Sequence, residues 1–157
     1  MKDSKISQPR VDKLHPLVKN LFEVFIDECE RQLGITLRVV QGLRTFAEQD
    51  ALYAIGRTKL KDEKGNKLKI VTKAKGGYSY HNYGLAIDVV PLIDGVPQWS
   101  YDYSKLATIA DKYGIESGSR WRFKDKPHFQ IIDGYTVQQL LDKHDASEVD
   151  KDGYVKL

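Results

Sequence analysis

Three side chains in two short segments could together bind a metal ion. His81 and Asp88 stand in the segment SYHNYGLAID, where a turn at Gly84 lets two side chains separated in the sequence converge. The neighbours of Asp88 are apolar, so we expect its carboxylate in a mostly buried strand, where a charge needs a charged partner or a metal. His128 begins a second apolar segment, HFQII. Two histidines and one carboxylate are a known ligand set for catalytic zinc, with the fourth position left for water.

A carboxylate near the second histidine could supply the proton transfer that zinc hydrolysis needs. Asp125 closely precedes His128, and a carboxylate so placed can take a proton from water and pass it on. Glu116 is the rival for this role. Asp125 could instead be a turn residue ahead of Pro127 or an acceptor for a ligand histidine. The three candidate ligands could also form a buried polar network without a metal.

The elements that must position these residues follow from periodicity and turn signals. Apolar residues recur at helical spacing from Leu14 to Gly34, β-branched runs indicate strands, and Thr45 with Glu48 is a capping-box pattern. The expected elements are a helix over 14–33, a strand over 35–42, a helix over 46–55, a hairpin or mobile flap over 57–79, a strand over 85–91, a helix over 102–113, a strand over 128–132 and a helix over 137–144.

This order of elements indicates the fold class. Helices separated by few strands, with local hairpin signals, predict an α+β fold in which a small, mainly antiparallel sheet packs with helices. The length of 157 residues is that of one domain. We therefore expect a single catalytic domain over 1–157, with 1–13 and 147–157 loosely packed because they are polar or charged ends of the chain.

The motif SxHxxGxAxD at 79–88, followed by acid-x-x-His at 125–128, resembles a known enzyme family. That family is the zinc D-alanyl-D-alanine carboxypeptidases and L-alanyl-D-glutamate peptidases, which includes bacteriophage endolysins. The segments 14–22, 42–58 and 114–121 are similar to the same family, so the resemblance extends over most of the chain. It implies the fold shared by these carboxypeptidases and Hedgehog-like domains. Arg120 departs from the family, because many relatives have an acid there.

The resemblance implies roles for individual residues. The zinc ligands would be His81, Asp88 and His128, holding one Zn²⁺ per chain, and Asp125 would be the general base. Arg44 would steady the oxyanion of the tetrahedral intermediate, a task to which a fixed guanidinium is suited.

Other residues have less specific expected roles. Arg44 could instead pair with Glu48 along a helix. Ser79 and Gln49 match family positions that line the site, and Tyr80 could contribute to an aromatic wall for a peptide substrate. The lysines of the expected flap could form a solvated surface or attract an anionic cell wall.

Composition excludes several classes of protein. Lys and Arg number 25 against 22 Asp and Glu, an excess too small to argue for nucleic acid, and no nucleic-acid motif is present. The single cysteine, Cys29, excludes an intrachain disulfide framework. No apolar run is long enough to span a membrane, and the N-terminus lacks the apolar segment of a secretory signal. We expect a monomer made in the bacterial cytoplasm, which reaches the wall through a membrane lesion made by another protein.

The predicted function is a zinc-dependent peptidoglycan peptidase of the endolysin type. The bond we favour is L-alanyl–D-glutamate in the stem peptide. The alternatives are a D,D-carboxypeptidase or dipeptidase acting on D-alanyl-D-alanine, and a zinc-containing binding module without catalysis. The carboxypeptidase would need a subsite for a terminal carboxylate, for which Arg120 or a lysine of the flap is a candidate.

Overall fold

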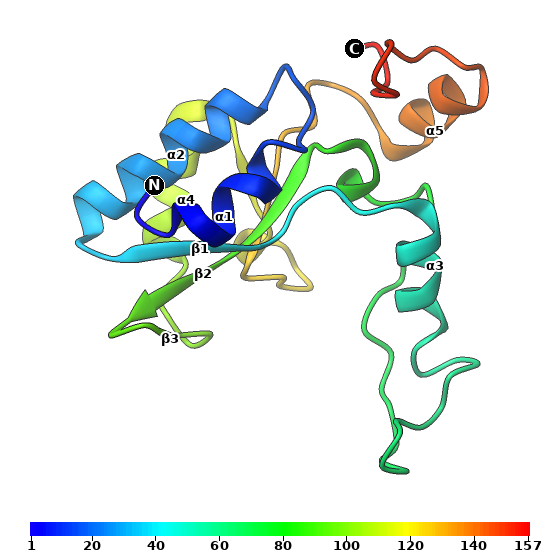
Figure 1. The fold of residues 1–157 in the computed structure, drawn as a ribbon, viewed down its shortest axis with the longest axis horizontal. Helices are drawn as coiled ribbons and strands as arrows, with labels where there is room; N and C mark the ends of the chain where they lie inside the picture. The colour runs from blue at the N-terminus through cyan, green and yellow to red at the C-terminus, as the bar shows by residue number, and fades with distance from the viewer.

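The computed structural model describes residues 1–157 and has an antiparallel sheet at its centre (Figure 1). The strands are β1 (Thr36–Gln41), β2 (Ala86–Ile93), β3 (Val96–Pro97), β4 (Glu116–Ser117) and β5 (His128–Gln130). Their order is β1-β2-β5-β4, and β3 forms a short hairpin with the end of β2. Every pairing is antiparallel. The predicted α+β fold with a small antiparallel sheet is confirmed.

Five helices accompany the sheet. They are α1 (Ser4–Val11), α2 (Lys19–Leu33), α3 (Phe46–Ala54), α4 (Ser104–Ala110) and α5 (Val137–Asp145). Helices α1 and α2 contact β1, and α4 contacts both α2 and β4. Helix α5 lies apart, near the C-terminus (Figure 1). None of the helices combines the length and apolar character that crossing a bilayer requires.

Strand alternation separates the core from the functional face of the sheet. Ile87 and Val89 on β2 and Phe129 on β5 are fully buried in one hydrophobic cluster with α2 and α4. The rings of Phe25 and Phe129 lie 5.1 Å apart in that cluster. Because successive side chains of a strand point to opposite faces, Asp88 between the two core residues of β2 must point away from the helices. His128 and Gln130, on either side of Phe129, must do the same.

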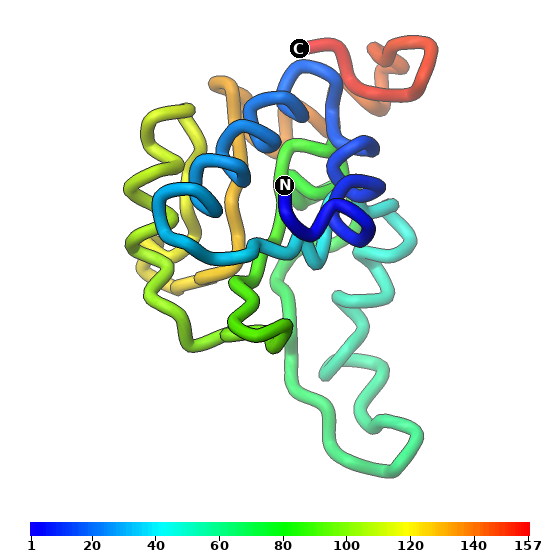
Figure 2. Tube along the Cα trace, turned by 60° about the vertical axis from the view of Figure 1, so that its left-hand side comes forward, coloured from blue at the N-terminus to red at the C-terminus, as the bar shows by residue number.

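An arm formed by residues 55–75 projects from the body after α3 (Figure 2). The predicted hairpin is confirmed here: Lys61 pairs with Lys67, and the Leu68 amide donates to the Leu60 carbonyl at 2.9 Å. No residue of the arm is buried. It is therefore a surface structure that contributes nothing to the hydrophobic core.

The N-terminal end of the chain is packed, and the expectation that residues 1–13 are loose is wrong, whereas residues 147–157 lie at the surface apart from Val155. Residues 4–11 form α1, whose Ser7 and Val11 are fully buried. The Val39 amide donates to the Ser7 hydroxyl at 3.0 Å. Near the other end, Val155 is only 3% exposed, and His15 Nε2 lies 2.8 Å from its carbonyl oxygen. Contacts between distant segments order these polar ends, and local composition does not reveal them.

The first long helix is shorter than expected. It begins at Lys19, not at Leu14, although Gly34 ends it in the left-handed conformation as predicted. His15 precedes Pro16, and a residue before proline is disfavoured in helical conformation. Residues 14–18 form turns instead, with Leu14 and Val18 still buried.

A candidate metal centre in an open cleft

Strand register places two of the predicted ligands opposite each other. In the pairing of β2 with β5, Asp88 stands across from His128 and Ile87 across from Phe129. Opposite residues on one face of an antiparallel pair have neighbouring side chains. The hydrophobic alternation that buries Phe129 therefore also brings the carboxylate and the imidazole together. A slip of one residue in either strand would turn that strand's ligand into the core and separate the pair.

The third predicted ligand comes from a 3₁₀ turn, Tyr80–Tyr83, just ahead of β2. Ser79 caps this turn by accepting from the His81 amide at 3.3 Å. Gly84 ends it with φ +69°, and a Cβ there would lie 2.6 Å from the His15 backbone nitrogen. Only glycine fits this combination of positive φ and close backbone approach. The turn fixes His81 beside the sheet, where it is 3% exposed.

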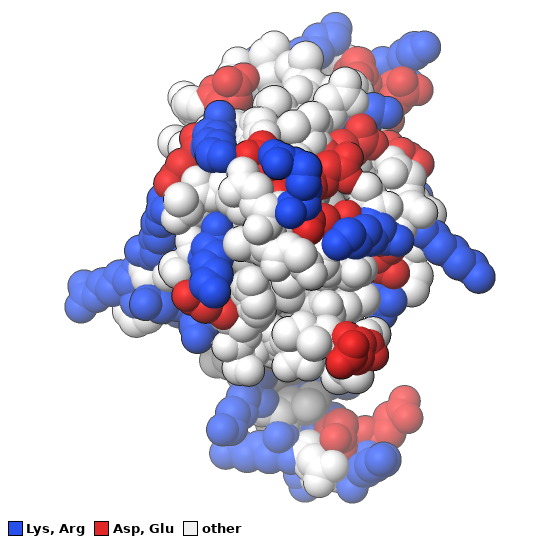
Figure 3. Space-filling model, turned by 90° about the vertical axis from the view of Figure 1, so that its left-hand side faces the viewer, with Lys and Arg blue, Asp and Glu red and all other residues white.

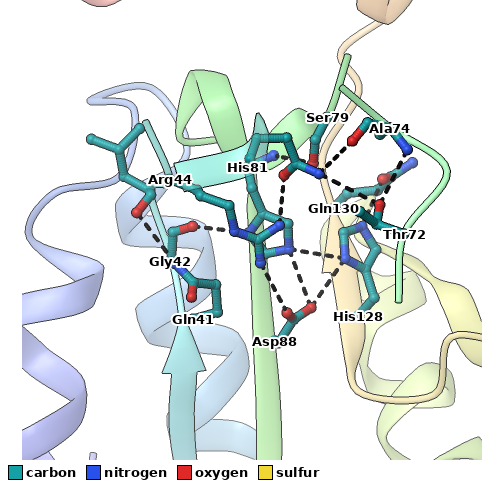
Figure 4. A network of polar contacts seen from close by, with 12 residues as sticks. Gln41, Gly42, Arg44, Thr72, Ala74, Ser79, His81, Asp88, His128 and Gln130 are labelled. Atoms are coloured by element: carbon teal, nitrogen blue, oxygen red, sulfur yellow. Dashed lines mark hydrogen bonds and ion pairs between the residues drawn. The ribbon is translucent and has the colours of Figure 1, made fainter. Parts of the chain in front are cut away.

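The three donor atoms converge (Figure 4). His81 Nε2 and His128 Nδ1 lie 3.2 Å apart, and Asp88 Oδ1 is 3.2 Å from the first and 3.1 Å from the second. The edges of a tetrahedron with zinc–nitrogen bonds of about 2.0–2.1 Å are about 3.3 Å long. The three atoms thus already have the mutual spacing of zinc ligands.

Hydrogen bonds to the outer ring nitrogens decide which nitrogens face the cluster. His81 Nδ1 donates to the Gly42 carbonyl at 2.9 Å, and His128 Nε2 lies 2.8 Å from the Gln130 amide oxygen. A carbonyl oxygen accepts only, so in the neutral imidazoles the inward nitrogens carry lone pairs. Two lone pairs and a carboxylate oxygen then meet without a proton between them. The donor set fits a divalent cation.

The protonation properties of the cluster agree with that chemistry. Burial by itself raises the pKa of Asp88, but the contacts with His128 and His81 outweigh it, so the pKa lies below the ordinary value. Burial lowers the pKa of His128, and the contact with Asp88 more than reverses this effect. The cluster therefore attracts positive charge, which a proton or a metal ion can supply.

Arg44 lies beside the cluster and is held there by a buried partner. Its guanidinium nitrogen Nη2 is 3.9 Å from Asp88 Oδ2, and Nη1 donates to the Gln49 amide oxygen at 2.7 Å. Burial lowers the pKa of Arg44, opposed by the charges of Asp88, Glu48 and Asp125, and an arginine remains charged in proteins. Glu48 instead accepts from the Thr45 amide at 2.8 Å, completing the predicted capping box. The alternative of an Arg44–Glu48 ion pair is not observed.

Gln49 has a different place from the one expected. It is fully buried and does not line the cleft. Its amide nitrogen donates to the Ala74 carbonyl at 2.8 Å and to the Thr72 hydroxyl at 3.4 Å. Gln49 therefore positions Arg44 and ties the base of the arm to α3, which leaves it no free polar atom for a substrate.

The cleft above the cluster has a volume of about 490 Å³. Ser79 and Tyr80 line it as expected, although the Tyr80 hydroxyl donates to the Tyr135 carbonyl at 2.7 Å and only its ring remains available. The lining residues are Arg44, Leu52, Val71, Thr72, Tyr78, Ser79, Tyr80, His81, Asp88, Trp121, Asp125, His128, Gln130 and Val137. The arm therefore contributes part of one wall, which the motifs do not reveal.

Asp125 is the better placed of the two candidate bases. It lines the cleft, and its carboxylate makes no hydrogen bond or ion pair with the protein. Partial burial of the carboxyl group in the cleft raises the pKa of Asp125, a shift opposed by His128 and reinforced by Asp88. Glu116 does not line the cleft and instead accepts from the Trp121 indole nitrogen at 2.5 Å.

Gln130 is a site residue that sequence analysis missed. Its amide oxygen faces His128 Nε2, and its amide nitrogen donates to Glu116 Oε2 at 3.4 Å. The acidic partner fixes the orientation of the amide, and the amide oxygen in turn fixes the tautomer of His128. The alternation of side chains along a strand could have identified it, because a residue two positions after His128 lies on the same face of the sheet.

Fold and site together define a metallopeptidase class, and comparisons with known proteins identify the family. A family model described as D-alanyl-D-alanine carboxypeptidase, of the peptidase M15 group, matches residues 72–131. The chain is 41% identical over 136 residues to the peptidoglycan L-alanyl-D-glutamate endopeptidase CwlK of Bacillus subtilis (strain 168), covering 79% of this chain and 77% of that protein. The chain therefore belongs to the peptidase M15 family.

Solved structures show the same fold. The L-Ala D-Glu endopeptidase ChiX of Serratia marcescens superposes with a TM-score of 0.56 at 25% identity, covering 80% of this chain and 86% of that one. The zinc complex of the vancomycin-resistance D,D-pentapeptidase VanY superposes with a TM-score of 0.56 at 17% identity, covering 82% and 78%.

Proposed function

We propose that this protein is a zinc-dependent endopeptidase that hydrolyses the L-alanyl–D-glutamate bond of the peptidoglycan stem peptide. The observation that carries the proposal is the convergence of His81, Asp88 and His128 at 3.1–3.2 Å in an open cleft. Asp125 and Arg44 line the same cleft. The choice of bond is supported by the 41% identity to a relative named for that activity.

The roles of the residues follow from their chemistry. His81, Asp88 and His128 would hold one zinc ion, which when bound polarises the scissile carbonyl and lowers the pKa of water. Asp125 takes the proton of the attacking water, and its raised pKa helps it return that proton to the leaving amine. Arg44 lines the same cleft, and its guanidinium would stabilise the oxygen that becomes negative in the tetrahedral intermediate.

The surroundings of Arg120 disfavour the D,D-carboxypeptidase alternative. That activity needs a cation for the terminal carboxylate of its substrate. Arg120 instead forms a bidentate pair with Asp111 at 2.6 and 2.8 Å, and neither Arg120 nor any lysine of the arm lines the cleft. The internal bond of an endopeptidase substrate makes no such demand.

Mass spectrometry of purified peptidoglycan after digestion, with and without a zinc chelator, tests the proposal. New N-terminal D-glutamate groups that disappear with the chelator are the expected result. Loss of terminal D-alanine instead would make the protein a D,D-carboxypeptidase. No product from a chain that retains zinc would make it a binding module. Zinc analysis and light scattering on the same sample test the proposed stoichiometry of one ion per monomeric chain.

We further propose an endolysin-type role, in which the enzyme of a bacteriophage reaches the wall through a membrane lesion. The resemblance of the 79–88 and 125–128 motifs to endolysins supports it. Bacteria that express the protein should lyse only after their membrane is permeabilised, with turbidity as the readout. Lysis without permeabilisation, or intact cells after it, contradicts this role.

A further inference from the structure

The arm carries the positive charge of the protein. Its residues, 55–75, include eight lysine and arginine residues and two acidic residues, a local charge of +6. The whole chain carries +3, so the remainder carries −3. Blue side chains accordingly predominate on the arm where it projects below the body in Figure 3. The molecule is an acidic body with a basic projection.

The cations of the arm have no acidic partners. On the body, Lys112 pairs with Glu28 at 2.8 Å and Arg120 with Asp111 at 2.6 Å. No lysine or arginine of the arm forms a salt bridge within the protein. Arg57, Lys73 and Lys75 lie over aromatic rings. All seven lysines of the arm are exposed to solvent, and five of them lie over no ring: Lys59, Lys61, Lys64, Lys67 and Lys69.

The arm nevertheless has a defined structure. At its neck, Gly56 has φ +77°, and a Cβ there would lie 2.4 Å from the Ile70 backbone nitrogen. At its tip, Asp62 Oδ1 accepts from the backbone nitrogens of Lys64 and Asn66 at 2.9 and 2.8 Å. Asp62 is thus occupied in forming the turn, so Glu63 is the one acid left to offset the lysines. A segment that buries nothing and concentrates like charge gains no stability from that charge, which indicates an external partner.

The arm is continuous with the cleft. Val71 and Thr72 belong to the arm and line the same cleft as His81 and Asp88. Lys73 Nζ lies 4.6 Å from the centre of the Phe123 ring, which belongs to the loop before β5. A long ligand that enters the cleft from this side therefore passes along the lysines.

We propose that the arm is a docking surface for the anionic peptidoglycan network, whose stem-peptide carboxylates pair with the exposed lysines while one stem occupies the cleft. This rests on the proposed function, which names that polymer as the substrate. A single exposed ion pair is weak, but several that bind one polymer reinforce each other. Because all the lysines are exposed, salt must weaken the attachment.

Binding to sacculi freed of teichoic acid, measured by sedimentation, tests the proposal. The arm variant carries Lys61→Glu, Lys64→Glu and Lys67→Glu. The control variant carries Lys5→Glu, Lys13→Glu and Lys156→Glu, the same change of charge at exposed lysines of the body that form no salt bridge. Both sets are also made with Asp125→Asn, so that the wall stays intact during the binding measurement.

The arm variant should bind sacculi at least tenfold more weakly at low salt, and the control less than twofold. High salt should abolish this difference. With Asp125 present, both variants should cleave a short soluble stem peptide within twofold of the unsubstituted protein. Equal loss in both variants, or no loss in the arm variant, overturns the proposal. Loss of binding to phosphatidylglycerol vesicles with sacculus binding unchanged also overturns it and assigns the arm to a membrane.

The two proposals fail in different ways. If the unsubstituted protein cleaves neither the wall nor the soluble peptide, the proposed function fails. Sacculus binding by the two variants still decides whether the arm is the docking surface.

Discussion

Charged side chains have opposite surroundings at the centre of the sheet and in the arm. At the centre, Asp88 meets two imidazoles and a guanidinium, and each histidine has a partner on its outer nitrogen. In the arm no residue is buried and the lysines have no acidic partner. The first arrangement fixes the geometry of reacting groups, and the second presents charge to a partner. Substitutions in the two regions should therefore have separable effects on chemistry and on attachment.

The largest effect on activity is expected from removing one of the predicted metal ligands. His128→Ala removes one of three donors, so cleavage of a soluble stem peptide should fall by about 10³-fold or more, because a metal Lewis acid contributes several kcal/mol. A chelator should lower cleavage by the unsubstituted protein to a similar extent. Added zinc should then restore cleavage by that protein but not by His128→Ala. Metal analysis and peptide cleavage provide the measurements. His144→Ala, at an exposed histidine outside the cleft, is the matched control, and an equal loss there would contradict the assignment.

The comparison extends to stability. Phe129→Ala should lower the free energy of unfolding by about 3–5 kcal/mol, because it leaves a cavity beside Phe25 in the core. Leu60→Ala in the arm, where the side chain is 56% exposed, should cost no more than about 0.5 kcal/mol. Denaturant unfolding measures both. A cost at Leu60 close to that at Phe129 would mean that the arm is part of the folding unit of the core.

Asp125→Asn should lower kcat by about 10²–10⁴-fold, the contribution of a positioned general base, with zinc content unchanged. The base works as the carboxylate, and the pKa of Asp125 is raised. As the pH falls, the unsubstituted protein should therefore begin to lose activity above the ordinary aspartate pKa of about 3.9. The variant should lack that decline. Glu116→Gln is the comparison, and a larger loss there would transfer the role of base to Glu116.

Arg44→Ala should lower kcat by about 10²–10³-fold with a smaller change in KM, since an oxyanion contact strengthens in the transition state. Arg57→Ala removes the same side chain from the arm, where it lies over the Tyr53 ring. It should leave cleavage of the soluble peptide unchanged. Steady-state kinetics on both variants separate the two regions, and a loss confined to KM at Arg44 would assign it to substrate binding alone.

The smallest of these effects is expected at Gln130. Gln130→Leu removes the acceptor for the outer nitrogen of His128, so zinc affinity should fall by about 10–100-fold. Gln130→Glu, which keeps an acceptor, should restore most of that affinity. Competition with a chromogenic chelator measures both values. Equal weakening by the two variants would indicate that Gln130 only fills space.

Local patterns predicted the elements that carry the site because those elements depend on near neighbours in the chain. The capping box at Thr45 and the glycine turn at Gly84 were both visible in the sequence and both formed. The failures have a different cause. Helix α1 contains Pro9 and has little amphipathic pattern, and it is held by distant partners such as Arg38, which pairs with Asp3 at 2.8 Å. No local rule could have found it.

The sequence alone determined which side chains are able to bind a metal, because ligand chemistry belongs to the residue type and the motif keeps the residues near turns and strand ends. It also determined which face of each strand they occupy, because alternation follows from the pleat. Tertiary structure decided which of them meet. The register of Asp88 against His128, the burial of Gln49 behind Arg44 and the continuity of the arm with the cleft each depend on contacts between residues far apart in the chain. Such contacts are set by the packing of the whole domain, which no short segment encodes.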